Sequence, residues 1–140
     1  MAPSGSRRAA RERALSLLYE AELKGEDTAT VLAGLAVTPD AFVVELVEGV
    51  GGHQGEIDGL ISRFSIDWSL GRMPIVDRNL LRLAVFELLH RPGTPVGVVI
   101  DEAVELAKRY STEDSGRFVN GVLSAVAGQV RAPTEGPVLK

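Results

Sequence analysis

Arginines crowd the beginning of this 140-residue sequence, and their type and spacing suggest chemistry first. Arg7, Arg8, Arg11 and Arg13 stand close together against a single acid, Glu12. At about 100° per residue, the first three share an arc of roughly 100° on one side of a helix. Three such guanidinium groups on a single strand of RNA would give a salt slope near −2. The same arrangement also fits a solvated basic flank, and this stretch alone does not decide between the two.

A second candidate site lies about a hundred residues later, in the stretch EDSGRFVNGVLSAV, residues 113–126. Helical projection places Phe118 at the edge of the apolar face, beside Arg117 and one turn beyond Asp114. An edge phenylalanine next to an arginine at a helix start can stack on an unpaired base. Asp114 can accept a hydrogen bond from a base amino group. The competing interpretations are a core-boundary phenylalanine and an acid that stabilises its own helix.

Catalytic chemistry has few candidates. The two histidines, His53 and His90, lie outside any recognisable metal-ligand motif, and no cysteine offers a thiolate. Glu56 and Asp58 would face different sides of a helix, which does not favour acid–base catalysis. A phosphate-binding loop of the G-x-x-x-x-G-K-[ST] type is also missing. We therefore predict no enzyme, no metal site and no cofactor.

Composition is that of an ordinary globular chain, with 45% hydrophobic and 24% charged residues and a net charge of −4. No apolar run approaches the roughly 20 residues of a membrane span, and no signal peptide is recognisable, so we expect a cytoplasmic protein without a membrane partner. Ten acids lie between Glu20 and Asp67, against only two basic residues. Any nucleic-acid contact must therefore be confined to particular patches.

Apolar periodicity and capping signals predict an all-α fold of six or seven helices. Helices are expected over about 6–23, from Asp27 or Thr28, from Thr38-Pro39-Asp40 with a break near Gly51-Gly52, over 74–90, over 98–110 and up to about 130. Ser6 is the expected cap of the first helix, and Tyr110 is expected on a buried face. We expect disordered tails at 1–5 and 131–140, and two packed subdomains at about 6–65 and 66–130.

Three longer motifs carry a family resemblance: RRAARERALSLLYE, DRNLLRLAVFEL and VVIDEAVELAKRYSTEDSGRFVNGVL. With them the sequence, from Arg7 to about Val130, resembles the NusB family of bacterial transcription antitermination factors. The resemblance implies an all-helical bundle in two subdomains, without catalytic activity. It also implies binding of single-stranded boxA RNA in nascent ribosomal RNA transcripts together with NusE, a small-subunit ribosomal protein. That complex would join the RNA polymerase antitermination complex.

The resemblance also implies roles for particular residues. The RNA-binding arginines of the family fall on Arg7, Arg8 and Arg11, with Ala9 where some relatives carry another arginine. The base-contacting region falls on the residues singled out above, Asp114, Arg117 and Phe118. The region where NusE docks falls on Tyr19, Asp77, Arg78 and Arg82.

Two alternatives remain open at this point. One is a pure protein-interaction module, such as a homodimer, whose arginines form subunit salt bridges and never meet RNA. Some family members are homodimers that cover the arginine-rich surface. The other is the RNA-binding domain of a ribosomal RNA cytosine methyltransferase, which has a related helical fold.

Overall fold

The computed structural model describes residues 3–66 and 68–131, with side chains from Arg7 onward. Within these ranges the chain is entirely helical, as predicted. Its elements are α1 (Pro3–Lys24), α2 (Thr28–Ala33), α3 (Ala41–Gly52), α4 (Gln54–Phe64), the 3-10 turn η1 (Leu70–Arg72), α5 (Ile75–His90), α6 (Val96–Tyr110) and α7 (Glu113–Val130). The seven α-helices of the described residues confirm the predicted number.

Local residue chemistry explains several of the helix ends. Gly25 adopts a φ of 67°, a left-handed conformation that suits glycine and ends α1. Asp27 caps α2 by accepting a hydrogen bond from the backbone N–H of Thr30 at 2.8 Å. Thr112 caps α7 in the same way, through the backbone N–H of Ser115 at 2.9 Å. The predicted break near Gly51-Gly52 is confirmed, because α3 ends at Gly52 and α4 begins at Gln54.

Three local predictions need correction. The first helix begins at Pro3, so Ser6 lies inside it and Pro3 to Gly5 is not a tail, while residues 1–2 and 132–140 lie outside the described residues. The third helix is expected to start at Thr38-Pro39-Asp40 but begins at Ala41. Its N-cap residue, Asp40, makes no side-chain capping bond. Tyr110 is 49% exposed, because it is the last residue of α6, where residues 108–110 are all exposed.

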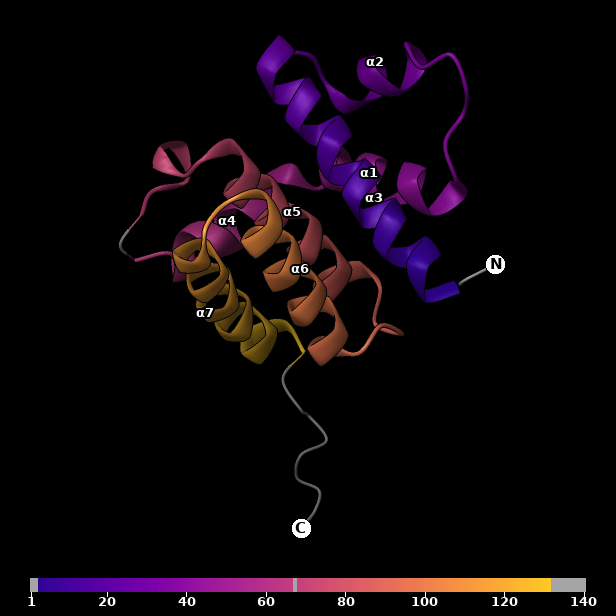
Figure 1. Cartoon of the computed structure of the whole chain (residues 1–140). Coiled ribbons are helices and arrows are strands. Elements are labelled where there is room, and N and C mark those ends of the chain that lie inside the picture. Colours follow the sequence, from indigo (N-terminus) through magenta and orange to yellow (C-terminus); the bar gives the residue numbers. More distant parts are fainter. Residues whose placement is uncertain (1–2, 67, 132–140) are drawn as a thin grey trace.

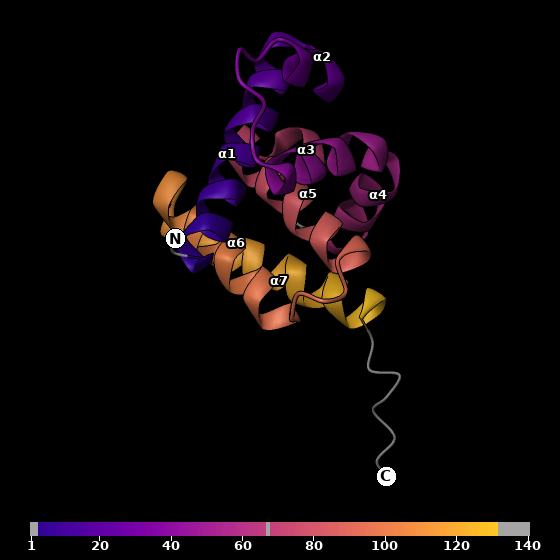
Figure 2. The ribbon, with the colours of Figure 1, turned by 90° about the vertical axis from the view of Figure 1, so that its right-hand side faces the viewer.

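The central helix of the bundle is α5, which packs against α1, α3, α4, α6 and α7. Figure 1 shows α1 crossing near α3 and α5, with α6 and α7 running side by side as a pair. The view in Figure 2 shows α2 at one end of the molecule, well away from the α6–α7 pair. Such a central position explains why ten of the sixteen residues of α5 are buried.

The core residues of the described chain form one cluster that reaches all seven α-helices. Helix α4 packs against both α5 and α7, although it belongs to the first of the two predicted subdomains. The boundary between residues 65 and 66 stays a prediction. Helices α3 and α5 approach closely at Gly49, where an added Cβ would lie 2.2 Å from the Phe86 ring. That glycine is therefore required by the packing.

Candidate nucleic-acid interface

Two of the four arginines of α1 are held by carboxylates of other helices. Arg11 is only 6% exposed and donates two hydrogen bonds to Glu87 of α5, at 2.8 and 2.9 Å. Arg8 donates two to Glu102 of α6, at 2.9 and 2.8 Å. These hydrogen bonds raise the pKa of both arginines and lower the pKa of Glu102. Two of the three arginines predicted to bind RNA therefore hold α1 against the rest of the bundle.

Arg7 differs from both, because its guanidinium carbon lies 4.4 Å from the centre of the Phe42 ring. The guanidinium carbon of Arg91 lies 4.7 Å from the same ring centre. The half-buried Phe42 therefore makes cation–π contacts with both arginines. Among the described residues Arg7 has no carboxylate within ion-pair distance. It also borders an open cavity of about 310 Å³ together with Thr94, Pro95 and Val98. Arg7 is thus the most available cation of the three.

The start of α7, comprising Asp114, Arg117 and Phe118, is far more open. Asp114 and Arg117 form an ion pair one turn apart, with side chains 86% and 75% exposed. Phe118 is half-buried and meets Trp68 edge to face, with ring centres 5.2 Å apart and planes at 85°. In Figure 1, α7 and the N-terminal end of α1 lie on opposite sides of α6. One RNA strand that touched both would have to pass over α6.

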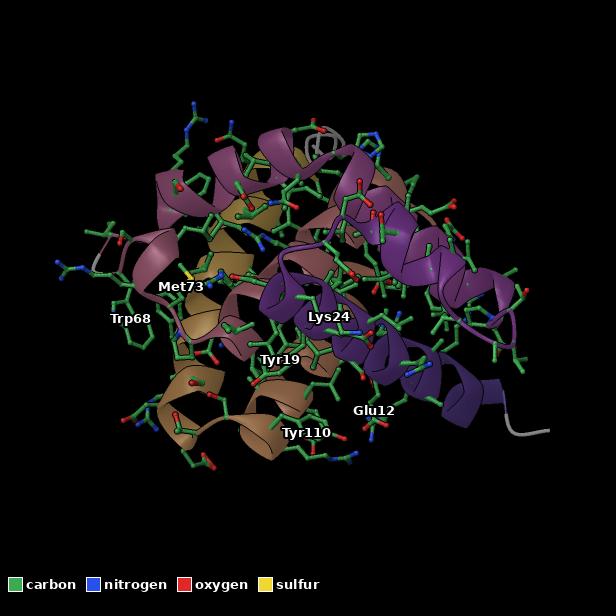
Figure 3. All side chains as sticks on the ribbon, turned by 90° about the horizontal axis from the view of Figure 1, so that it is seen from above. Glu12, Tyr19, Lys24, Trp68, Met73 and Tyr110 are labelled. Carbon is green, nitrogen blue, oxygen red and sulfur yellow. The ribbon has the colours of Figure 1, made fainter. Side chains whose placement is uncertain are left out.

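Of the four residues predicted to dock NusE, Tyr19 is the accessible one. It is 37% exposed and lines an apolar groove of about 370 Å³ with Leu15, Val76, Glu12 and Tyr110. Figure 3 shows Tyr19, Tyr110 and Glu12 gathered on one face of the molecule. The Tyr110 hydroxyl donates to Glu12 at 3.3 Å. The apolar periodicity of the sequence predicts a buried Tyr110, which is wrong. Its position in the last turn of a helix is the sequence feature that could have indicated its exposure.

The other three predicted docking residues serve intramolecular bonds. Asp77 is completely buried and accepts a hydrogen bond from Ser115 of α7 at 2.7 Å. Arg78 pairs with Glu22 of α1 and donates to the carbonyl of Met73 at 2.7 Å. In this conformation the side chain of Asp77 has no exposed surface that a partner could contact. Its role in docking stays a prediction.

Arg82 completes this network. It donates two hydrogen bonds to Asp58 of α4, at 2.8 and 3.0 Å, and approaches Glu22 at 3.4 Å. Burial alone would raise the pKa of Glu22, but hydrogen bonds from Arg78 and Asn79 lower it overall. The network joins α1, α4 and α5, and a partner contact by Arg78 or Arg82 stays a prediction.

The two histidines, far apart in sequence, meet in space. The ring centres of His53 and His90 lie 4.1 Å apart, and the Glu56 Oε1 atom lies 3.5 Å from Nε2 of His90. They border an open cavity of about 550 Å³ with Phe86. The described part of the chain holds no group of three or more His, Cys, Asp or Glu residues arranged to bind a metal ion. Nor does it contain a helix long and apolar enough to cross a membrane.

The fold and these exposed aromatic and charged surfaces define an all-helical binding protein. Comparison with known proteins gives its family: the NusB family model matches residues 8–128, and the chain belongs to this family. The transcription antitermination protein NusB of Saccharopolyspora erythraea is 51% identical over 130 residues, which cover 89% of this chain and 88% of the relative. The NusB homologues are transcription antitermination factors and not enzymes, which confirms the predicted absence of catalysis.

Solved structures agree with this assignment. A structure of T. maritima NusB superposes with a TM-score of 0.77 at 42% identity, over 88% of this chain and 91% of the other. Another, of antitermination factors NusB and NusE in complex with dsRNA, gives a TM-score of 0.75 at 35% identity, over 88% and 96%. The recognition of the family and the all-helical bundle expected from it are both confirmed.

Proposed function

We propose that this protein is a non-enzymatic adaptor of the RNA polymerase antitermination complex. It binds boxA-type single-stranded RNA together with a NusE ribosomal protein during ribosomal RNA transcription in the cytoplasm. Support comes from the family, from the relative's complex with NusE and RNA, and above all from the open start of α7. This function is favoured over a methyltransferase domain because the matched relatives are named antitermination proteins.

The start of α7 carries the proposal because its groups are free to meet a ligand. Arg117 pairs only with a carboxylate as exposed as itself, so a phosphate can replace that partner at little cost. Phe118 offers a ring for stacking, which requires an unpaired base. Both features favour a single strand, whereas the related complex contains double-stranded RNA.

NusE is proposed to dock on the groove beside Tyr19. The groove is lined mainly by apolar side chains, and two exposed tyrosines border it. Tyrosine is among the residues that most often dominate protein–protein interfaces. A second protein bound there would add its own RNA contacts to those of α7, which raises the effective concentration of the RNA. A homodimer that covers Arg7 and Arg8 is the alternative resting state.

Binding of fluorescently labelled boxA RNA, measured by anisotropy with and without NusE, tests the function. Phe118→Leu removes the aromatic ring but keeps apolar volume at the core boundary. We expect it to weaken RNA binding about 5- to 150-fold, the loss of one stacked base. Arg13→Ala is the matched control, because Arg13 is exposed and lies outside both proposed surfaces. Equal affinities for Phe118→Leu and the unmodified chain would contradict the proposal.

A further inference from the structure

Trp68 is the only tryptophan of the chain, and it lies at the surface between α4 and η1. Its side chain is 37% exposed, and its backbone carbonyl accepts a hydrogen bond from the buried Ser65 hydroxyl. The indole touches Phe118 edge to face. Trp68 therefore extends the aromatic surface at the start of α7, although it comes from a different part of the chain.

The surroundings of this aromatic pair suit a nucleic acid. Arg117 is one residue from Phe118 and 75% exposed, and the exposed Arg72 ends the short turn that follows Trp68. Cations beside open aromatic rings are the combination that single-stranded RNA sites use, with bases on the rings and phosphates on the cations. The apolar groove beside Tyr19 lies elsewhere, since Figure 3 shows Trp68 and Met73 apart from Tyr19 and Tyr110.

We propose that Trp68 is a second base-stacking residue, which acts beside Phe118 on the same RNA strand. This inference rests on the proposed RNA-binding function. The planes of the two rings stand at 85°, so a base on one ring is nearly perpendicular to a base on the other. The strand must turn sharply between these two bases. Stacked base pairs keep their planes parallel, so a duplex cannot occupy both rings, and the site selects an unpaired, splayed strand.

The lone tryptophan gives a direct test with the full chain. A short single-stranded boxA RNA is added without NusE, and the intrinsic fluorescence is followed alongside the anisotropy of a labelled copy of the RNA. We expect quenching of Trp68 at the same RNA concentrations at which anisotropy rises. A duplex of the same sequence should quench much less. Trp68→Ala should weaken single-strand binding about 5- to 150-fold, and Trp68→Phe should retain most of it.

Leu23→Ala is the matched control, since Leu23 is another exposed apolar side chain, at 61%, and lies outside both proposed binding surfaces. It should leave RNA binding without NusE unchanged. Thermal unfolding of each variant separates lost folding from lost binding. RNA that binds unmodified protein and Trp68→Ala equally, without quenching, overturns the role of Trp68 and leaves the proposed function standing.

Two further outcomes are informative. If Trp68→Ala loses NusE binding while RNA binding is kept, Trp68 is a protein contact and the inference is wrong. If the unmodified chain binds no boxA RNA even with NusE, the proposed function fails, and this inference fails with it.

Discussion

The arginine run of α1 (Arg7, Arg8 and Arg11) and the start of α7 carry similar charged groups but use them differently. Arg8 and Arg11 each make two hydrogen bonds to a carboxylate of another helix, and Arg11 is buried. Arg117, by contrast, pairs within its own helix at the surface. The region with the higher density of positive charge in the sequence is therefore the one with less charge available to a ligand.

Distance along the chain explains the difference. Arg8 and Arg11 bond to carboxylates 94 and 76 residues away, and folding brings these opposite charges together. Arg117 and Asp114 are three residues apart, so their pair forms within one helix and adds little to the tertiary structure. A cluster of arginines in a sequence can thus serve the fold as well as a polyanion. Here the arginine run of α1 mostly stabilises the fold.

The largest expected effect comes from breaking the Arg11–Glu87 pair. Arg11→Ala would leave the Glu87 carboxylate, whose side chain is 2% exposed, buried without its cation. We expect the free energy of unfolding to fall by about 3 to 5 kcal/mol. Urea denaturation followed by circular dichroism measures this loss.

Replacing both partners provides the control. Arg11→Met combined with Glu87→Leu fills similar volume without burying a charge, so it should regain most of the lost stability. Arg117→Ala should cost under about 1 kcal/mol, because exposed ion pairs contribute little. If Arg11→Ala were as mild as Arg117→Ala, the contrast between the two regions would be wrong.

Much of the fold could be predicted from local sequence. Apolar residues three and four positions apart define the helices, while Gly25, Gly52 and the 91–95 segment mark their ends. The error at Tyr110 has a physical reason, because periodicity gives the face of a residue but not how far the neighbouring helices extend. The pairing of Arg11 with Glu87 had no local signal at all.

The candidate site was accessible to sequence reasoning only where its residues are neighbours. Asp114, Arg117 and Phe118 share one stretch of helix, so the pattern could group them. Trp68 joins Phe118 through the packing of the α4–α5 connection on α7, which no spacing indicates. Likewise, the family resemblance predicts a docking role for Asp77, whereas its bond to Ser115 requires α5 and α7 to be in place and has no signal in the sequence.

A smaller effect, on the salt dependence of RNA binding, tests which arginines of α1 meet phosphate. Each phosphate contact on a single strand contributes about 0.7 to the slope of log K against log salt. Arg7→Ala should therefore reduce the slope by about 0.7, because Arg7 is the one arginine of the run without a carboxylate within ion-pair distance among the described residues. Over a rise from about 50 to 200 mM salt, the unmodified chain should lose about 2.6-fold more affinity than this variant.

The double variant that replaces Arg11 and Glu87 tests whether Arg11 only holds the fold together or also contacts phosphate. It keeps the fold but lacks the third arginine, and we expect its slope to match that of the unmodified chain, because Arg11 is buried. A further loss of about 0.7 would mean that Arg11 leaves Glu87 to bind phosphate. The arginine run would then resemble the start of α7 after all.

The smallest expected effect is the response of the Arg8–Glu102 pair to acid. Hydrogen bonds from Arg8 hold the pKa of Glu102 below its ordinary value of 4.5. A carboxyl whose pKa is lowered by folding stabilises the fold above its ordinary pKa, and this contribution disappears as the pH falls through the lowered value. The stability difference between the unmodified chain and Glu102→Gln, under about 1 kcal/mol, should therefore be constant near neutral pH and shrink below about pH 4.5.

Asp101→Asn is the control, because Asp101 is an exposed residue of the same helix without an ion pair in the described residues. This variant should show no such trend. Urea denaturation across this pH range measures both differences, and equal trends for the two variants would mean that Arg8 is as loosely held as Arg117.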